Sequence, residues 1–316
     1  MSGFIERIAR DLDITIQDVR RLAWTAPRRY KVYYIDRRHG KGRRQIAQPT
    51  PDVKMAQRWL NRNVLATFPV HNSATAYVRG RGIRYNAERH VESNYLLKMD
   101  FKNFFPSILA HDLVLHTRKY SPYRFNEEEM LLLMRLLYWM PRNTNTLRLS
   151  IGAPSSPMLS NLLMWDFDNR VRAICDERNV IYTRYADDLA FSTIEPGVLH
   201  EINQIVESIV NELDYPKLRI NDEKTLNLSK KHSRRLTGLV LSNEGVVSIG
   251  RHRKRTIRAM VHSEIIGELS YDDRVRLKGI LAFCQDVEPA FVLRLKKRYG
   301  NDAVSSIVRG DFIRRS

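Results

Sequence analysis

Cysteine is almost absent from this chain of 316 residues, which contains only Cys175 and Cys284. They lie 109 residues apart with no paired spacing, so neither a disulfide framework nor a cysteine zinc site is predicted. No run of about 18 apolar residues occurs, which argues against a membrane-spanning helix. The opening residues, MSGFIERIARDLDITIQ, carry charges throughout and do not read as a signal peptide. We therefore expect a cytoplasmic protein with no membrane partner.

Acidic residues are scarce relative to basic ones. The chain has 53 Lys and Arg against 35 Asp and Glu, a net charge of +18. Residues 20–92 carry a net charge of +13 and residues 217–316 carry +11, whereas residues 93–216 carry −4. A basic excess favours a polyanionic partner, because each neutralised phosphate releases counterions. The distribution fits two cationic arms around a centre that binds cations; a merely soluble basic protein is the alternative.

The apolar pattern, which shows no repeat or low-complexity tract, predicts an α+β fold. Strands are expected at 30–36 and 43–49, joined as a hairpin by the turn RRHGKG, and a third strand within 93–105. The order expected for 95–245 is the β-α-β-β-α-β order of a ferredoxin-like domain. Helices are expected at 3–26, 53–68, 127–140, 157–178 and 198–213, with basic helices beyond residue 249.

Two adjacent aspartates, Asp187 and Asp188, stand in the string YTRYADDLAFST between two predicted strands. Such a pair suits the turn of a hairpin. Asp100 ends another predicted strand 87 residues before Asp187. Partly buried, three carboxylates would repel each other unless divalent cations neutralised them, as Mg²⁺ does in two-metal sites. A solvated turn is the alternative for any isolated pair, and Asp272–Asp273 in the same chain reads as an ordinary helix cap.

Several strings resemble motifs of one enzyme family. YADD at 185–188 resembles the catalytic turn of reverse transcriptases, and KMDFKNFFPSI at 98–108 resembles their first carboxylate strand. IGAPSSPMLSNLLM at 151–164 resembles the segment between them in the retron and group II intron branches. NAERH at 86–90 and LTG at 236–238 fit the Asn-Ala-x-x-His and Val-Thr-Gly elements of retron enzymes, with Leu replacing Val. The chain is thus similar, over about residues 30–245, to bacterial retron reverse transcriptases.

The resemblance implies a right-hand polymerase with fingers, a ferredoxin-like palm and a helical thumb. The implied divisions are an N-terminal helical segment (1–29), fingers (30–94), a palm (95–245) with a fingers-side helical insertion at about 111–148, and an RNA-binding thumb (246–316). The implied activity is RNA-directed DNA polymerisation from deoxynucleoside triphosphates. It would copy part of a cognate structured non-coding RNA, starting from a guanosine 2′-hydroxyl, into RNA-linked multicopy single-stranded DNA. Anti-phage defence with a toxin or other effector protein is also implied.

The resemblance also implies roles for individual residues. Asp100, Asp187 and Asp188 would be catalytic and, with the Phe101 carbonyl, would hold two Mg²⁺ ions, for which Mn²⁺ is a substitute. The implied nucleotide-binding residues are Arg44, Phe105 as an aromatic steric gate, Gly152, Ala153 and Lys224. The implied RNA-binding residues are Asn86, His90, Thr237, Gly238, Arg251, Arg253, Lys254 and Arg255.

Some of these roles have alternatives. Core packing is the alternative for Phe105, a solvated position for Lys224, and a structural histidine for His90. Ile151 departs from the family, which often has Gln before the glycine, so contact with the nucleotide would differ there. For the whole chain, the alternatives are a group II intron-like or diversity-generating reverse transcriptase, or an RNA-binding scaffold that restrains a toxin. The three carboxylates argue against a pure scaffold.

Overall fold

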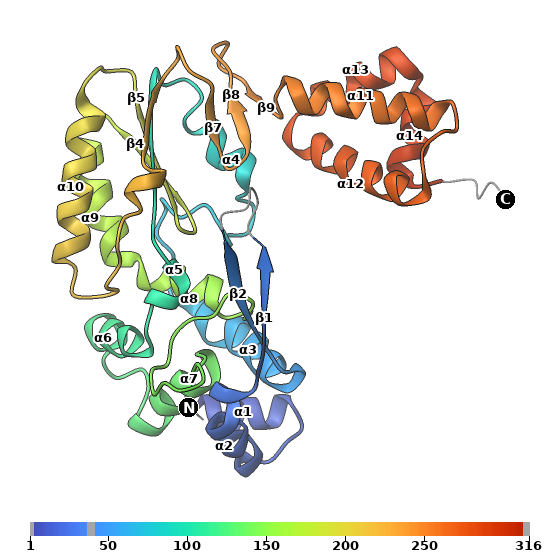
Figure 1. The fold of residues 1–316 in the computed structure, drawn as a ribbon. Helices are drawn as coiled ribbons and strands as arrows, with labels where there is room; N and C mark the ends of the chain where they lie inside the picture. The colour runs from blue at the N-terminus through green and yellow to red at the C-terminus, as the bar shows by residue number, and fades with distance from the viewer. Residues whose placement is uncertain (1–2, 37–41, 312–316) are drawn as a thin grey trace.

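The computed structural model describes residues 3–36 and 42–311. Its N-terminal part consists of helices α1 (Phe4–Asp11) and α2 (Ile16–Thr25), followed by strands β1 (Tyr30–Asp36) and β2 (Arg43–Pro49). The two strands pair in antiparallel fashion and form a ribbon that rises from the N-terminal helices (Figure 1). The predicted strand pair is confirmed, while residues 37–41 of the expected turn lie outside the described residues.

In the described part of the chain, five α-helices lie between β2 and residue 138, two before and three after strand β3 (Tyr95–Asp100). Helix α7 opens with three glutamates behind an Asn126 capping box, and acidic side chains suit a helix N-terminus. It packs against α2 and α3, so the predicted helical insertion lies beside the N-terminal part (Figure 1). The five helices are α3 (Pro51–Asn63), α4 (Ile83–Glu88), α5 (Phe104–Ser107), α6 (Ala110–Tyr120) and α7 (Glu127–Leu137).

A four-stranded antiparallel sheet occupies the centre, in the order β4-β5-β3-β6. Strand β3 (Tyr95–Asp100) lies between β5 (Asp188–Thr193) and β6 (Leu226–Ser229), and β4 (Ile181–Tyr185) is the outer neighbour of β5. Helices precede β4 and β6, which gives the β-α-β-β-α-β connectivity of a ferredoxin-like domain. This part of the predicted fold is confirmed.

The helices on the sheet differ from expectation in one place. Instead of one helix over 157–178, the structure has α8 (Ser156–Leu163) and α9 (Trp165–Glu177), which meet at Met164 with φ −83° and ψ 5°. The apolar pattern runs through this point because both helices bury one face, so periodicity alone could not reveal the break. Helix α9 packs against α10 (Val198–Glu212), and both contact strands of the sheet (Figure 1).

The C-terminal quarter of the chain forms a second packed unit. A small antiparallel sheet, β7 (Arg234–Leu236), β8 (Leu239–Leu241) and β9 (Val247–Ser248), leads into a bundle of helices that stands apart from the central sheet in Figure 1. The bundle consists of α11 (Arg251–Ile265), α12 (Tyr271–Val287), α13 (Pro289–Tyr299) and α14 (Asn301–Arg309). None of the helices in the described part of the chain combines the length and apolar character that crossing a membrane requires.

Strand β3 contributes to two hydrophobic cores, because successive side chains point to opposite faces of a sheet. Leu97 and Met99 belong to the large core that contains residues of α9 and α10. Leu96 belongs to the core shared with α4, β8 and the C-terminal helices. By the same alternation, Asp100 lies on the face of Leu96, away from the large core. The sheet therefore presents its terminal carboxylate on the face opposite α9 and α10.

Candidate active site

The sheet register brings Asp100, Asp187 and Asp188 together. Asp100 is directly opposite Asp188 where β3 and β5 pair, and the Phe101 amide donates to the Asp187 carbonyl across 3.3 Å. Directly opposed side chains on antiparallel strands share one face. Tyr185 also pairs with Asp188, so Ala186 and Asp187 form the two-residue turn between β4 and β5. Carboxylates 87 and 88 residues apart in sequence are thus neighbours at one end of the sheet.

Burial and mutual repulsion raise the pKa of two of these carboxyls. Burial, followed by the charge of Asp100, raises the pKa of Asp187. Burial, followed by the charges of Asp187 and Asp100, raises the pKa of Asp188 to about 6. Asp100 itself is only 7% exposed. A site that makes ionised carboxylates unfavourable gains stability when a cation neutralises them.

A protein cation already pairs with Asp100. Lys224 Nζ donates to the two oxygens of the Asp100 carboxylate across 3.0 and 2.9 Å. Within residues 3–36 and 42–311, no three or more Asp, Glu, His or Cys side chains stand in the arrangement of a formed metal centre. The donor set nevertheless fits Mg²⁺, which prefers one or two carboxylates per ion and completes its octahedron with water and phosphate oxygens. The raised carboxyl pKa values show where such a charge would be favoured.

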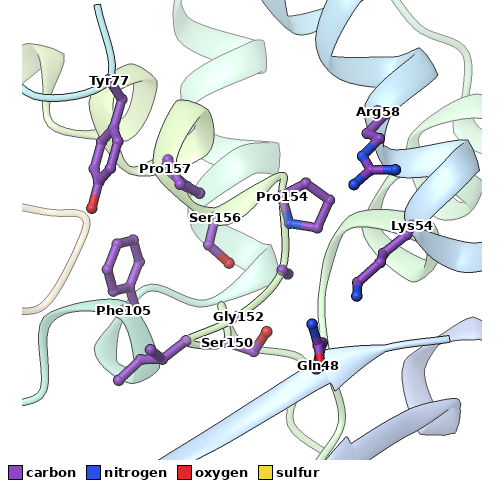
Figure 2. Close-up of a pocket in the computed structure, with 12 residues that line it drawn as sticks. Gln48, Lys54, Arg58, Tyr77, Phe105, Ser150, Gly152, Pro154, Ser156 and Pro157 are labelled. Atoms are coloured by element: carbon purple, nitrogen blue, oxygen red, sulfur yellow. The ribbon is translucent and has the colours of Figure 1, made fainter. Parts of the chain in front are cut away.

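A cavity of about 370 Å³ opens in front of the carboxylates. Arg44, Phe105, Asp187 and Lys224 line it, together with Tyr77. A second cavity of about 370 Å³ shares Tyr77, Phe105 and Ile151 with it as lining residues. The second cavity also receives Gln48 and the basic side chains of Lys54 and Arg58, as Figure 2 shows. Two connected cavities with cationic residues suit a polyanionic substrate.

The comparisons with known proteins fit this geometry. Residues 36–241 match the family model described as reverse transcriptase (RNA-dependent DNA polymerase). The chain is 40% identical over 280 residues to the Retron Ec83 reverse transcriptase of Escherichia coli, covering 88% of this chain and 89% of that protein. It is 30% identical over 302 residues to the Retron Ec86 reverse transcriptase of the same species, covering 92% and 89%. The chain belongs to the retron reverse transcriptases.

It is accordingly an RNA-directed DNA polymerase, from a family that generally uses divalent metal ions. A solved structure of telomerase from Candida albicans, in complex with the TWJ fragment of telomeric RNA, matches with a TM-score of 0.50 at 12% identity. That match covers 92% of this chain and 58% of the telomerase chain, and it concerns the fold alone. With the family, it confirms the predicted right-hand polymerase fold.

The residues expected to bind the nucleotide, besides Lys224, line one or both of the two cavities. Arg44 is an exposed residue of β2 that lines the cavity, and half-buried Phe105 packs edge-on against Phe104. Gly152 has φ 121°, and a Cβ there would lie 3.1 Å from the Ala47 carbonyl oxygen. The close approach of β2 therefore requires glycine at this position. Buried Ala153 lines the second cavity.

Two residues expected to contact RNA are instead inside the protein. His90 is 0% exposed, and its ring nitrogens lie 2.7 Å from the hydroxyls of Ser192 and Thr183. Asn86, 1% exposed, accepts hydrogen bonds from Thr75 and Thr183. Burial lowers the pKa of His90 to about 3, so it stays neutral at physiological pH. The expectation of direct RNA contact is corrected: the NAERH string joins α4 to the strands that flank the carboxylates.

The remaining RNA-binding candidates lie on the C-terminal unit. Thr237 and Gly238 form the β7–β8 turn with φ 47° and 85°, and Arg253 donates to the Gly238 carbonyl across 3.2 Å. Arg251, Arg253 and Arg255 are exposed on α11. Lys254 is not, because its ammonium forms a 2.6 Å ion pair with Glu288 and the two side chains are 17% and 12% exposed. Lys254 is therefore placed to join α11 to the rest of the bundle.

The sequence did not single out several residues that line the cavities, among them Lys54, Arg58 and Tyr77. Lys54 and Arg58 lie four residues apart on α3, a spacing that places them on one helix face, so the basic pattern of 53–68 contained a usable signal. Tyr77 offered none. Tyr77 lies outside the predicted helices and strands. It has φ 61°, is 51% exposed and lines the cavity beside the carboxylates. Its position depends on contacts with residues more than 80 positions away.

Proposed function

We propose that this retron enzyme reverse transcribes part of a cognate structured non-coding RNA. Synthesis would start from the 2′-hydroxyl of a branching guanosine. The product would be multicopy single-stranded DNA that stays joined to RNA. The observation that carries the proposal is the pairing of Asp100 with Asp188 beside Asp187, at the mouth of a cavity with cationic walls. Its retron relatives support the choice of RNA and primer over those of an intron-type or diversity-generating enzyme.

The proposed division into parts is the one that the family resemblance implies. Residues 1–29 form the N-terminal segment, and residues 30–94 the fingers, whose ribbon carries Arg44. Residues 95–245 form the palm, with the insertion at about 111–148 beside the fingers. Residues 246–316 form the thumb. The basic excess of residues 20–92 and 217–316 then falls mainly in the proposed fingers and thumb, which would contact the phosphates of a template and product duplex.

Asp100, Asp187 and Asp188, with the Phe101 main-chain carbonyl, are proposed to hold two Mg²⁺ ions, and Mn²⁺ is a substitute with the same ligand preference. When bound, such ions supply an activated hydroxyl and charge compensation for pyrophosphate. The carboxylates contribute an orientation fixed by the sheet register. The raised pKa values of Asp187 and Asp188 support a cation beside these two carboxylates, while Asp100 pairs with Lys224.

The cavity residues are proposed to bind the deoxynucleoside triphosphate. Arg44 binds phosphate oxygens through its planar guanidinium. Phe105 occupies the space that a ribose 2′-hydroxyl would need. Gly152 and Ala153 allow the backbone to approach the nucleotide closely. Lys224 pairs with Asp100 and lines the cavity proposed to hold the phosphates, where it would donate a proton to the leaving pyrophosphate.

The C-terminal unit is proposed to bind the RNA. Exposed Arg251, Arg253 and Arg255, with the Thr237–Gly238 turn, face solvent on one unit and suit the phosphates of an A-form stem. We also propose that the enzyme works in the cytoplasm, where its RNA is transcribed, within an anti-phage defence system. An effector protein would then act on the state of the RNA–DNA product.

The test is a reaction of the purified protein with its neighbouring RNA, Mg²⁺ and deoxynucleotides. DNA joined covalently to RNA is expected, released only by an enzyme that cleaves 2′,5′ branches. Asp187→Asn with Asp188→Asn should abolish synthesis and leave RNA affinity largely intact. The matched control is Asp272→Asn, because Asp272–Asp273 lies at the N-terminus of α12 where Ser270 caps the helix. Free DNA with an ordinary primed end would contradict the retron reaction, and synthesis by the double variant would contradict the site.

A further inference from the structure

We propose that a buried cluster of Asp168, Arg184 and Asn161 positions two parts of the active site together: the turn that carries Asp187 and the segment that carries Tyr77. Tyr77 is then a specificity-determining residue that contacts the nucleotide. The inference rests on the proposed catalytic site. It adds residues that neither the motifs nor the family description assigns.

The cluster is centred on an ion pair without solvent access. Arg184 and Asp168 are both 0% exposed. Arg184 Nε donates to Asp168 Oδ1 across 2.9 Å, and Nη2 donates to Oδ2 across 2.6 Å. Tyr182 adds a 2.7 Å hydrogen bond to the same carboxylate. A buried ion pair stabilises a fold little more than apolar residues of equal volume. Its specific contribution is to hold the guanidinium in one orientation, in which its remaining N–H groups bind fixed partners.

One direction leads to the catalytic turn. Arg184 is a residue of β4, three positions before Asp187 in the turn. Its side chain points to the opposite face of the sheet from those of Thr183 and Tyr185. From there its Nη1 donates to the Ala186 carbonyl across 3.3 Å. Ala186 has φ 58°, which is unfavourable for a residue with a Cβ. The guanidinium therefore stabilises the strained Ala186 backbone, which places Asp187 at the cavity.

A second direction leads to residues 73–77. Asn161 Oδ1 accepts from Arg184 Nη1 across 3.1 Å, and Asn161 Nδ2 donates to the Ala76 carbonyl across 2.9 Å. The Arg184 backbone adds two bonds, from its amide to the Ser73 carbonyl (2.7 Å) and from the Thr75 amide to its carbonyl (2.8 Å). Asn161 is 1% exposed. One arginine thus fixes this segment with both its main chain and its side chain.

Tyr77 follows immediately and reaches the cavity. Its φ of 61° is an outlier for a bulky residue, and such strain persists where surrounding contacts enforce it. The side chain is 51% exposed, lines both cavities and extends towards Phe105 in Figure 2. An exposed aromatic ring held by strain between two substrate cavities is suited to pack against a base or sugar. The cluster therefore sets the distance between Tyr77, Phe105 and the carboxylates.

The test uses primed DNA synthesis on a simple homopolymer template, which needs neither the cognate RNA nor a 2′-primer. Tyr77→Ala should raise the KM for deoxynucleotide about tenfold or more with a smaller change in kcat, while Tyr77→Phe retains near-parental values. Asn161→Ala, which leaves the Arg184–Asp168 pair intact, should shift KM in the same direction. The double variant should be no worse than Tyr77→Ala, because both changes act through one position.

A second readout does not depend on activity. In Asn161→Ala, hydrogen exchange of the Thr75 and Arg184 amides should accelerate while the unfolding midpoint stays close to that of the control Asn169→Ala. Asn169 is an exposed α9 residue that bonds only within its helix. Additive effects of Tyr77 and Asn161 changes, or a lower midpoint with an unchanged KM, would overturn the proposal. A parent protein that makes DNA neither on the primed template nor on its neighbouring RNA would instead overturn the proposed catalytic site.

Discussion

Lys224 and Asp100 form the ion pair that neutralises one of the three active-site carboxylates. They lie 124 residues apart in sequence, and Nζ is 2.9 and 3.0 Å from the two carboxylate oxygens. The Asp100 side chain is 10% exposed and that of Lys224 is 51% exposed. The ammonium therefore approaches from the solvent side. It supplies Asp100 with a positive charge that a bound divalent cation would also supply.

Lys224→Met should make the protein's stability more dependent on Mg²⁺. Without divalent ions the variant loses a partly exposed ion pair, a change of about 0.2–1 kcal/mol in the free energy of unfolding. With Mg²⁺ it should gain more than the parent, because no ammonium competes for Asp100. Urea unfolding with and without Mg²⁺ measures both values. Lys231→Met, a change on an exposed turn outside the cavity, serves as the control. Equal Mg²⁺ stabilisation of variant and parent would contradict the competition.

Asp188 should make the metal-free protein less stable as the pH rises. Its folded pKa is raised from the ordinary 3.8 to about 6 by burial and by Asp187 and Asp100, so the folded state binds more protons than the unfolded state between these values. Stability therefore falls as pH rises through this window. Asp188→Asn removes this effect and should unfold with about 1–3 kcal/mol more free energy than the parent near neutral pH.

The advantage of Asp188→Asn should shrink towards about pH 4, where the parent carboxyl is protonated. Denaturant unfolding at several pH values, in the presence of a chelator, measures the difference. The control is Asp176→Asn, an α9 carboxylate whose ion pair with Arg172 is largely exposed. A constant difference between Asp188→Asn and the parent over the whole range would show that burial does not disfavour this carboxylate.

Substitutions of two neighbouring basic residues on α11 should have different effects, one on RNA binding and the other on stability. Arg255→Gln removes an exposed charge, so RNA affinity should fall and the slope of log affinity against log salt should shrink by about 1. Lys254→Gln instead removes the 2.6 Å ion pair with Glu288, which keeps only Arg294 at 3.0 Å. Stability should therefore fall, and the salt slope should stay near the parental value. RNA titrations at several salt concentrations, together with thermal unfolding, distinguish the two. The same salt-slope change in both variants would place Lys254 on the RNA after all.

The sequence indicated that Asp100, Asp187 and Asp188 lie together, because this information is local, and the sheet register brings them together. Asp100 ends one apolar strand, and Asp187 and Asp188 interrupt another pair, so the pattern alone indicated charge at strand ends. The sheet order followed from the succession of strands and helices. The break at Met164 did not, because apolar periodicity continues across it.

The residues that support the site were harder to predict. Asp168 lies on a helix and Arg184 in a strand, and nothing in their spacing indicates that they meet with 0% exposure. For His90 the sequence leaves RNA contact and a structural role open, and only its buried partners, Ser192 and Thr183, favour the structural role. Such assignments depend on which elements pack together, which a single sequence does not state.

Phe105 should control the choice between deoxyribonucleotides and ribonucleotides. Its ring is half-buried, lines both cavities and is braced by Phe104 at a centroid distance of 5.4 Å, so it cannot move aside without disturbing a core residue. Phe105→Val opens room for a 2′-hydroxyl, and discrimination should fall by about tenfold or more. The ratio of kcat/KM for the two nucleotide classes on one primed template measures this. Phe105→Tyr keeps the ring and should keep the discrimination. If Phe105→Val discriminates as well as the parent, Phe105 is a packing residue and the gate lies elsewhere in the cavity.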